Sequence, residues 1–291
     1  MKVALTWVFV GFLWLLHWLP MPLLRAIGWA VGTVAFPLAR ERREVAMTNL
    51  RLCFPELEAP EIRRLAGAHF VSFCRAVVDR PVLWWGSRRR IERLIRVQGL
   101  DHVKALAGRP VILLCPHFVG LDAAGTRLNV DLLGCTVYSK PKNPVLDWLL
   151  QRGRSRFNPT LMLSRQDGMR RIVRAIGENR AFYYLPDQDF GPKESIFVPF
   201  FGVQAATIPA LSRLVRLTGA VVLPVVSFQR PDGYEVEVQA PWVDFPGESV
   251  EADTAFMNRF IESQVLRMPE QYFWLHKRFK TRPPGEQRFY Q

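Results

Sequence analysis

An almost uninterrupted apolar stretch opens the chain, from Val3 to Leu19, and only Thr6 and His17 within it are plainly polar. Three tryptophans alternate there with Phe, Val and Leu, and Pro20-Met21-Pro22 ends the run. As a helix this stretch would extend about 25 Å, slightly less than a hydrocarbon core of about 30 Å. We therefore predict a hydrophobic membrane anchor helix within residues 1–22, which either spans a thin bilayer or lies deep in one leaflet.

Two other interpretations of this stretch fit less well. A cleaved signal peptide has a suitable length, but no small-x-small site follows the run and the tryptophan content is unusual. A buried core helix with an apolar face all round would need a large host domain at the very end of the chain. The anchor remains the preferred interpretation.

Apolar residues at helical spacing continue behind the anchor, from Leu23 to Leu38, with Gly28 and Gly32 between them. This pattern predicts a second, amphipathic helix that lies on the bilayer surface or against the main domain. Arg25, Arg40, Arg42 and Arg43 follow the anchor, whereas Lys2 alone precedes it. The positive-inside bias therefore predicts a protein body on the cytoplasmic face of the membrane.

In the rest of the chain, short β-rich runs alternate with helical patterns. The predicted strands are Val111–Cys115, Thr136–Tyr138, Leu161–Leu163, Ala181–Leu185, Ala220–Phe228 and Tyr234–Gln239. The predicted helices lie near Leu121–Leu128, Pro144–Gly153, Asp167–Glu178, Ile208–Leu217 and Ala252–Met268. This alternation indicates an α/β fold with a layered mixed β-sheet flanked by helices. The turn signal Pro231-Asp232-Gly233 predicts that the last two strands pair as a hairpin.

No internal repeat, low-complexity tract or Gly/Ser linker divides the chain after the anchor, so residues 23–291 are predicted to form a single domain. With 49% hydrophobic and 22% charged residues among 291, a disordered or collagen-like chain is excluded. The formal net charge of +13 indicates an anionic partner, which by composition alone is nucleic acid, anionic lipid, a phosphorylated substrate or an acidic protein. The four cysteines form no C-x-x-C pair and no zinc-binding spacing, which favours free thiols.

One segment combines residue types that suit catalysis. The strand Val111–Cys115 runs into a loop with His117, and a helical pattern begins just after Asp122. Five positions apart on a regular helix the two side chains would not meet, but a chain bend at Gly120 would bring them together. Asp122 would then accept the Nδ1 proton of His117 and leave Nε2 as a general base. The alternative is a solvent-facing histidine and an aspartate stabilised by the helix dipole.

Other chemistries have less support in the sequence. G-x-S-x-G, G-x-x-x-x-G-K-[ST] and G-x-G-x-x-G patterns are all missing, which disfavours hydrolase, NTPase and dinucleotide-binding functions. His117 and Asp122 lack a third ligand at metal-like spacing. Cys115 would be a thiol nucleophile if it pointed the same way as His117, but a buried cysteine on an apolar strand is far commoner.

The segment Cys115-Pro-His117-x4-Asp122 matches the H-x4-D/E motif of glycerolipid-type acyltransferases. The carboxy-terminal half resembles one branch of them closely, the bacterial lipid A biosynthesis acyltransferases (lauroyl and myristoyl transferases). The matching runs are Tyr184-Leu-Pro-Asp187-Gln-Asp189-Phe-Gly191-Pro, Phe197-Val-Pro-Phe-Phe-Gly202 and Glu270-Gln-Tyr-Phe-Trp274-Leu-His276-Lys-Arg278-Phe-Lys280-Thr-Arg282-Pro. H-x4-D alone is weak, whereas the three runs in order behind an anchor are specific, and the resemblance covers essentially the whole chain.

The resemblance implies transfer of a fatty acyl group from acyl carrier protein to a hydroxyl of a phosphorylated lipid A precursor, at the cytoplasmic face of the inner membrane. It implies no metal or organic cofactor and no acyl-enzyme. His117 would deprotonate the acceptor hydroxyl, and Asp122 would orient His117 and stabilise its protonated form. Arg154 and Arg156 lie about where the family places an arginine for the oxyanion, and Arg154 is the first choice.

Further residues are expected to bind substrate. Asp187, Gln188 and Asp189 follow an apolar strand and should lie at the same sheet edge as His117, where they would bind sugar hydroxyls of the acceptor or order the arginines. His276, Lys277 and Arg278 alternate with aromatic residues, and a phosphorylated glycolipid needs charge-assisted contacts of this kind. The alternatives are an acidic turn and a solvated surface helix.

Two rival functions remain open at this stage. A nucleic-acid-binding protein is suggested only by the charge and the arginine-rich stretches, no known module is present, and no nucleic acid partner is expected. The second is the same chemistry with other substrates. The acceptor would then be a phosphatidylinositol mannoside or an aminolipid, or the donor would be acyl-CoA. A dense arginine cluster over residues 88–96 suits the membrane surface or the carrier protein equally.

Overall fold

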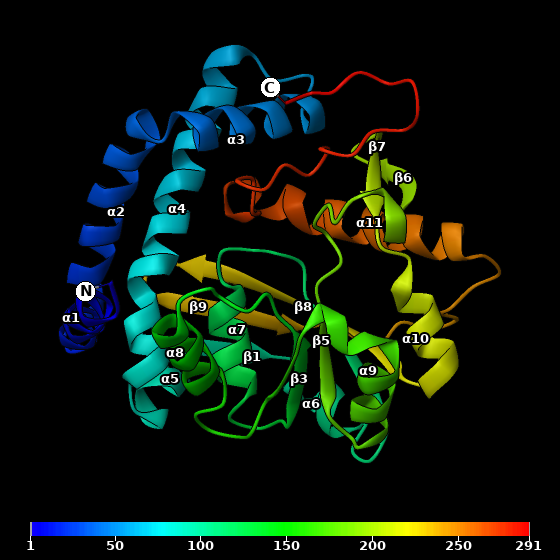
Figure 1. Ribbon diagram of the computed structural model, residues 1–291, viewed down its shortest axis with the longest axis horizontal. Helices are drawn as coiled ribbons and strands as arrows, with labels where there is room; N and C mark the ends of the chain where they lie inside the picture. The colour runs from blue at the N-terminus through cyan, green and yellow to red at the C-terminus, as the bar shows by residue number, and fades with distance from the viewer. Residues whose placement is uncertain (1, 291) are drawn as a thin grey trace.

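The computed structural model describes residues 2–290 and forms one α/β assembly, a central sheet with helices on both faces and a helical layer along one side (Figure 1). The predicted anchor begins at Met1 and the predicted domain ends at Gln291, and both of these residues lie outside the described part. The strands are β1 (Ile95–Gln98), β2 (Val111–Leu114), β3 (Gly134–Val137), β4 (Leu161–Leu163), β5 (Ala181–Tyr184), β6 (Ile196–Phe200), β7 (Val203–Thr207), β8 (Val221–Arg230) and β9 (Gly233–Val238).

The helices precede the sheet and then alternate with its strands. They are α1 (Lys2–Leu16), α2 (Met21–Leu38), α3 (Arg40–Cys53), α4 (Ala59–Trp85), α5 (Arg88–Leu94), α6 (Leu100–Lys104), α7 (Leu121–Leu128), α8 (Pro144–Arg154), α9 (Gly168–Gly177), α10 (Ala210–Thr218) and α11 (Val250–Arg267). Short 3-10 turns are η1 (Arg165–Asp167), η2 (Pro192–Glu194) and η3 (Pro269–Gln271).

The main sheet has seven strands in the order β1-β9-β8-β2-β5-β3-β4. All neighbouring strands run parallel except β8 and β9, which form the predicted antiparallel hairpin. The expected mixed sheet flanked by helices is therefore confirmed. Strands β6 and β7 form a separate antiparallel pair near α11 (Figure 1).

The side chains of the fully buried strand β2 belong to two apolar layers, because successive side chains point to opposite faces of the sheet. Ile112 and Leu114 pack with residues of α9, α10 and α11. Leu113 and Cys115 pack on the other face with residues of α5 and α7 and the end of α4. A strand covered on both faces reads as a continuous apolar run, which is why this strand was predictable.

Helix α2 is fixed along α4, as Figure 1 shows for the blue and cyan helices. A Cβ atom at Gly28 or Gly32 would lie 2.6 Å from the Cα of Arg75 or Val71, so both glycines allow close contact. The buried Arg25 guanidinium pairs with Asp79 of α4 at 3.3 Å. Of the two placements expected for this amphipathic helix, the one against the main domain is confirmed.

The N-terminal helices also keep an apolar face on the outside. Large exposed apolar side chains follow α1, α2 and the turn between them, namely Trp7, Val8, Phe9, Phe12, Trp14, Leu15, Trp18, Leu23, Trp29, Val31, Val34 and Leu38. Helix α2 is long and apolar enough to cross a membrane by length and composition, and the apolar part of α1 is shorter. Val10 of α1 packs against Val145 and Leu149 of α8, so one side of α1 contacts the body of the protein.

Several elements were not predicted from the sequence. They are β1, the hairpin β6–β7 and the helices α3 to α6. The 27-residue helix α4 contains Pro81 and carries buried polar residues, His69, Ser72 and Asp79, which hide its apolar period. In the arginine cluster, Arg90 donates hydrogen bonds to the carbonyl groups of His17 and Leu19 and so ties α5 to the end of α1.

Candidate active site

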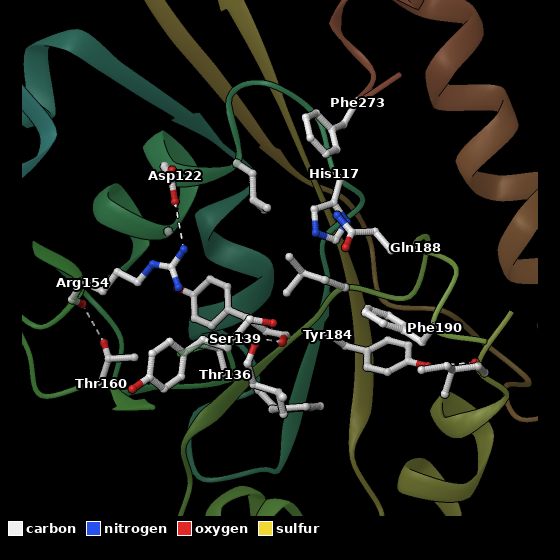
Figure 2. A pocket seen from close by; sticks show the side chains of 18 of the residues that line it. His117, Asp122, Thr136, Ser139, Arg154, Thr160, Tyr184, Gln188, Phe190 and Phe273 are labelled. Atoms are coloured by element: carbon white, nitrogen blue, oxygen red, sulfur yellow. Dashed lines mark hydrogen bonds and ion pairs between the residues drawn. The ribbon is translucent and has the colours of Figure 1, made fainter. Parts of the chain in front are cut away.

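A cavity of about 870 Å³ opens where β2, β3 and β5 end, and His117 lies on its wall. Parallel strands bring their carboxyl ends to one edge, and the loops that follow them form the crevice. Helices α4, α7, α8, α9 and α10 contribute the other walls. Figure 2 shows polar side chains around this space, with His117 and Arg154 on different sides of it.

The imidazole of His117 is held by Asp187 rather than by Asp122. The Nδ1 atom of His117 lies 2.7 Å from Oδ1 of Asp187, and the backbone N–H of His117 donates to Oδ2 at 2.8 Å. A carboxylate only accepts hydrogen bonds, so Nδ1 carries the proton and Nε2 is left as the basic nitrogen. Burial opposes a charge on the Asp187 side chain, but the contacts from His117 nevertheless hold the pKa of that carboxyl below its ordinary value.

The register of the sheet explains this pairing. Leu114 of β2 lies opposite Tyr184 of β5, and His117 and Asp187 each follow three positions later. The C-terminal segment then fixes the loop, because the N–H of Phe273 donates to the carbonyl of His117 at 2.9 Å. The N–H of Val119 donates to the carbonyl of Gln271 at the same distance. The position of the loop that carries His117 therefore depends on the end of β2, on the segment after β5 and on the C-terminal segment.

Asp122 lies in the first turn of α7, and its carboxylate faces two arginines. Its Oδ2 is 2.9 Å from Nε of Arg80 on α4, and its Oδ1 is 3.2 Å from Nη2 of Arg154 at the end of α8. Burial opposes the charge, but the two guanidinium groups lower the pKa of Asp122 to about 2. The predicted pairing of Asp122 with His117 is therefore wrong.

The bend expected at Gly120 is also not what the structure shows. Gly120 has an ordinary backbone conformation, with φ −81° and ψ 3°. A Cβ atom there would lie 3.0 Å from the hydroxyl of Ser227 on β8. Gly120 thus allows α7 to approach the sheet, and the start of α7 carries Asp122 towards α4 and α8.

Of the two predicted oxyanion arginines, only Arg154 lines the cavity. Arg156 donates to the carbonyls of Leu83 and Gly86, and its guanidinium lies over the ring of Phe157. It therefore connects its loop to the end of α4. The oxyanion role of Arg154 stays a prediction.

The three residues after β5 have different surroundings. Gln188 lines the cavity next to His117, as Figure 2 shows. Asp189 is buried, and its two oxygens accept hydrogen bonds from Gly191 and Thr281. Gln188 is thus placed to meet a ligand, whereas Asp189 joins its loop to the C-terminal segment and its predicted contact with substrate is not supported.

Most of the predicted basic triplet near the C-terminus makes contacts within the folded chain. Arg278 is only 2% exposed and donates to the carbonyl of Ala206 and the hydroxyl of Thr207. Nε2 of His276 accepts the N–H of Asp189, and burial with nearby Arg278 lowers the pKa of His276 to about 4. Lys277 lies 3.9 Å from Glu41. These positions do not support the expectation that His276, Lys277 and Arg278 bind phosphate.

Sequence reasoning missed Arg80, which lines the cavity from the C-terminal part of the 27-residue helix α4. Nothing near Arg80 in the sequence marks it, because α4 meets α7 only in the folded protein. The role of Asp187 was missed for a related reason. Its place at the correct sheet edge was expected, but not that β5 lies directly beside β2.

The cavity offers a base but no metal cluster within residues 2–290, where no group of three or more His, Cys, Asp or Glu side chains is arranged to hold an ion. All four cysteines are free. Cys115 is buried in the apolar layer, and this burial raises the pKa of its thiol. A thiolate nucleophile at Cys115 is therefore not supported, and the arrangement suits proton transfer by His117.

Comparisons with known proteins find similar sequences over most of the chain. The family described as bacterial lipid A biosynthesis acyltransferase matches residues 1–281. The lipid A biosynthesis lauroyltransferase of Escherichia coli K12 is 36% identical over 286 residues, which cover 97% of this chain and 93% of that one. The lipid A biosynthesis palmitoleoyltransferase of the same organism is 35% identical and covers 98% and 94%.

Two further similarities are more distant. The lipid A biosynthesis myristoyltransferase of Escherichia coli K12 is 31% identical over 263 residues, with 88% of this chain and 80% of that one covered. Among solved structures, a 1-acyl-sn-glycerophosphate acyltransferase from Thermotoga maritima aligns with a TM-score of 0.40 and 14% identity, covering 79% of this chain and 98% of that one.

Proposed function

Because the chain belongs to the family of bacterial lipid A biosynthesis acyltransferases and is thus an acyltransferase, we propose that it transfers a fatty acyl chain from acyl carrier protein to a hydroxyl of a lipid A precursor. The observation that supports this chemistry best is the His117–Asp187 pair at 2.7 Å on the wall of the cavity. A histidine whose second nitrogen is held by a carboxylate is a general base for a hydroxyl.

In the proposed reaction, Nε2 of His117 takes the proton of the acceptor hydroxyl while its oxygen attacks the thioester carbonyl carbon. The resulting oxyanion requires a hydrogen-bond donor, and Arg154 is the predicted one. When the intermediate collapses, the carbon–sulfur bond breaks, and the protonated His117 returns its proton to the leaving thiolate. An ester and a free thiol result, and no acyl-enzyme or cofactor is needed.

Asp187 stabilises the imidazolium that forms in this step and fixes the ring orientation. Both of its oxygens are engaged by His117, one through the ring and one through the backbone N–H. A buried carboxylate in this position acts on the charged form of the base, which exists only during the reaction.

The apolar part of the cavity suits an acyl chain. On the side of α9 and α10, Arg213 of α10 also lines it, and its apolar lining there consists of Met169, Ile172, Leu185, Phe190, Ile208 and Leu214. Ligand cavities of this kind bind the apolar body of a ligand and use a few polar groups for orientation. The acyl chain would lie there with its carbonyl near His117.

The exposed apolar face of α1 and α2 supports membrane association of this reaction. The lysine and arginine excess behind the first helix supports a position on the cytoplasmic face of the inner membrane. A lipid acceptor would then reach the cavity from the bilayer, while the soluble carrier protein would arrive from the aqueous side.

The test is acyl transfer in vitro by the full chain in detergent, with acyl carrier protein thioesters of several chain lengths and a defined lipid A precursor. The product is identified by mass spectrometry. His117→Gln should lower kcat by on the order of 10³-fold or more. The matched control His102→Gln, on α6 outside the cavity, should behave like the wild type.

Undiminished turnover in His117→Gln would exclude His117 as the base. Equal turnover with acyl-CoA and with the carrier-protein thioester would contradict the proposed donor. Transfer to another lipid in preference to the lipid A precursor would contradict the proposed acceptor.

A further inference from the structure

We propose that Arg80 and Arg154, bridged by Asp122, form a phosphate-binding clamp at the polar end of the active-site cavity. The inference rests on the proposed function, because it names the substrate group that this part of the same cavity would hold. The clamp consists of Arg80 on α4, Arg154 on α8 and Asp122 on α7.

The geometry holds two guanidinium groups next to each other. Asp122 accepts from Nε of Arg80 through one oxygen at 2.9 Å and from Nη2 of Arg154 through the other at 3.2 Å. Without the carboxylate between them, the two positive groups would repel each other. Figure 2 shows Arg154 extending to Asp122 across the cavity from Phe190. Thr160 also donates to the carbonyl of Arg154 at 2.8 Å and fixes the end of α8.

The clamp keeps both charge and donors for a ligand. Two guanidinium groups and one carboxylate leave a net charge of +1, and all three residues line the cavity. Each guanidinium has five N–H donors. Within residues 2–290, Arg80 and Arg154 use only one side-chain nitrogen each, and the other nitrogens have no protein partner. Their side chains are 38% and 36% exposed, so they are accessible from the cavity.

A phosphate fits this arrangement better than other groups. The planar guanidinium matches phosphate oxygens in paired, charge-assisted hydrogen bonds. Neutral hydroxyl groups, among them those of Tyr138, Ser139 and Thr160, also line the cavity. A neutral sugar would not need the positive charge. His276, Lys277 and Arg278 do not line the cavity.

Two phosphates in the proposed reaction have this chemistry. One is the phosphate of the acceptor glycolipid, and the other is the phosphodiester of the pantetheine arm that carries the acyl group. The acceptor hydroxyl and the thioester carbonyl must both reach His117, whose ring lines the same cavity, while the phosphates lie farther along each substrate. The experiments below distinguish the two sources.

The first experiment measures binding without turnover. Inorganic phosphate is titrated into the full chain by calorimetry in a buffer free of other multivalent anions. The wild type should bind phosphate, and Arg80→Gln and Arg154→Gln should each weaken binding by about tenfold or more. His117→Gln should keep the wild-type affinity even though it stops transfer. Phosphate binding by the clamp can therefore be measured even if the proposed transfer reaction is wrong.

Matched controls keep this result interpretable. Arg96→Gln removes an equally charged side chain that pairs with Asp232 on the outer surface of the sheet, and phosphate binding should not change. Arg80→Lys keeps the charge but loses the planar group, so it should restore only part of the affinity. Thermal unfolding of each variant separates lost binding from lost folding. Phosphate binding that is the same in Arg80→Gln and in the wild type would overturn the proposal.

The second experiment uses steady-state kinetics with matched substrates. Arg80→Gln should raise KM by about tenfold for the substrate that carries the bound phosphate and change kcat much less. If the bound phosphate belongs to the acceptor, Arg80→Gln and the wild type should have equal KM values for a dephosphorylated acceptor. If it belongs to the donor, they should have equal KM values when acyl-pantetheine replaces acyl-phosphopantetheine. A penalty that is equal for all four substrates would overturn the clamp. Arg154→Gln should show the same KM penalty together with a fall in kcat, because Arg154 is also the predicted oxyanion donor. A loss confined to kcat in Arg154→Gln would overturn the clamp and leave Arg154 with the oxyanion role alone.

Discussion

At the scale of single residues, the contact with His117 that was expected of Asp122 is made by Asp187, and Asp122 has a different role. Asp187 holds the imidazole of His117, and Asp122 holds the guanidinium groups of Arg80 and Arg154. The H-x4-D spacing therefore connects a base to an arginine-positioning carboxylate, and the partner of the base comes from a neighbouring strand. Variants of the two aspartates should consequently differ in kind.

Asp187→Asn should lower kcat by on the order of 10³-fold, because an amide neither stabilises the imidazolium nor enforces the Nδ1 proton. Acyl transfer rates at saturating substrate measure this loss. Asp122→Asn is the matched comparison, and because Asp122 contacts Arg80 and Arg154 rather than His117, its effect should fall mainly on KM. A loss of kcat in Asp122→Asn as large as that in Asp187→Asn would contradict this division of roles.

A second residue-scale consequence concerns His69, which is fully buried in α4. Its Nδ1 lies 3.0 Å from the carbonyl of Glu270, and its Nε2 has no hydrogen-bond partner. Burial lowers the pKa of His69 to about 4. Between about pH 6.5 and pH 4 the unfolded chain therefore binds a proton that the folded protein excludes, so stability falls as the pH falls through this window.

His69→Asn should flatten this dependence, because asparagine keeps a donor for the Glu270 carbonyl but does not titrate. The loss of unfolding free energy from pH 7 to pH 4.5 should be smaller in the variant by about 2–3 kcal/mol. Denaturant unfolding at a series of pH values measures it. Some acid sensitivity will remain, because the pKa of His276 is lowered in the same direction. If the unfolding free energy of His69→Asn fell with pH as steeply as that of the wild type, His69 would not be the group responsible for this acid sensitivity.

At the scale of elements, the local hydrophobic pattern predicted the bounds of individual strands and helices. The strand Leu161–Leu163 and the helix Leu121–Leu128 have the bounds expected from their apolar runs, and Pro231-Asp232-Gly233 forms the turn of the last hairpin. What local pattern does not contain is strand order. The contact between His117 and Asp187 depends on β5 lying beside β2, and Arg80 reaches the cavity only because α4 packs on α7.

The packing of α2 on α4 permits a matched test at this scale. In Gly32→Ala the new methyl group would lie 2.6 Å from the Cα of Val71, so the two helices must separate. The variant should lose about 1–3 kcal/mol of unfolding free energy. Gly67→Ala lies in the interior of α4 with no atom near the new methyl group, and it should gain about 0.5–1 kcal/mol. Thermal or denaturant unfolding compares the two, and equal effects would exclude the close contact at Gly32.

At the scale of the whole molecule, the exposed apolar residues are concentrated on one flank. The N-terminal helices lie together along α4, and the cavity opens beside the same helix, which supplies Phe73, Val77 and Arg80 to its wall. A bilayer contacting the flank of α1 and α2 would therefore lie close to the entrance for a lipid acceptor. Helix α1 contacts both α4 and α8, so its position relative to the cavity is fixed by the fold.

This arrangement makes membrane binding depend on the outer face of α1. Phe9 and Phe12 are 51% and 55% exposed, and burying each ring in lipid is favourable by about 1.5–3 kcal/mol. A double variant Phe9→Glu/Phe12→Glu should lower the fraction that floats with vesicles of anionic phospholipid by at least about tenfold. Leu217→Glu, at a comparably exposed position on α10, should float like the wild type.

Transfer in the same variants shows whether the flank and the cavity act together. With a lipid acceptor embedded in vesicles, Phe9→Glu/Phe12→Glu should lose activity in parallel with its loss of binding. With the acceptor dispersed in detergent, its kcat should match the wild type, because His117 and Asp187 are untouched. If the variant floated normally, or lost activity equally in detergent, the outer face of α1 would not be the surface that delivers the lipid.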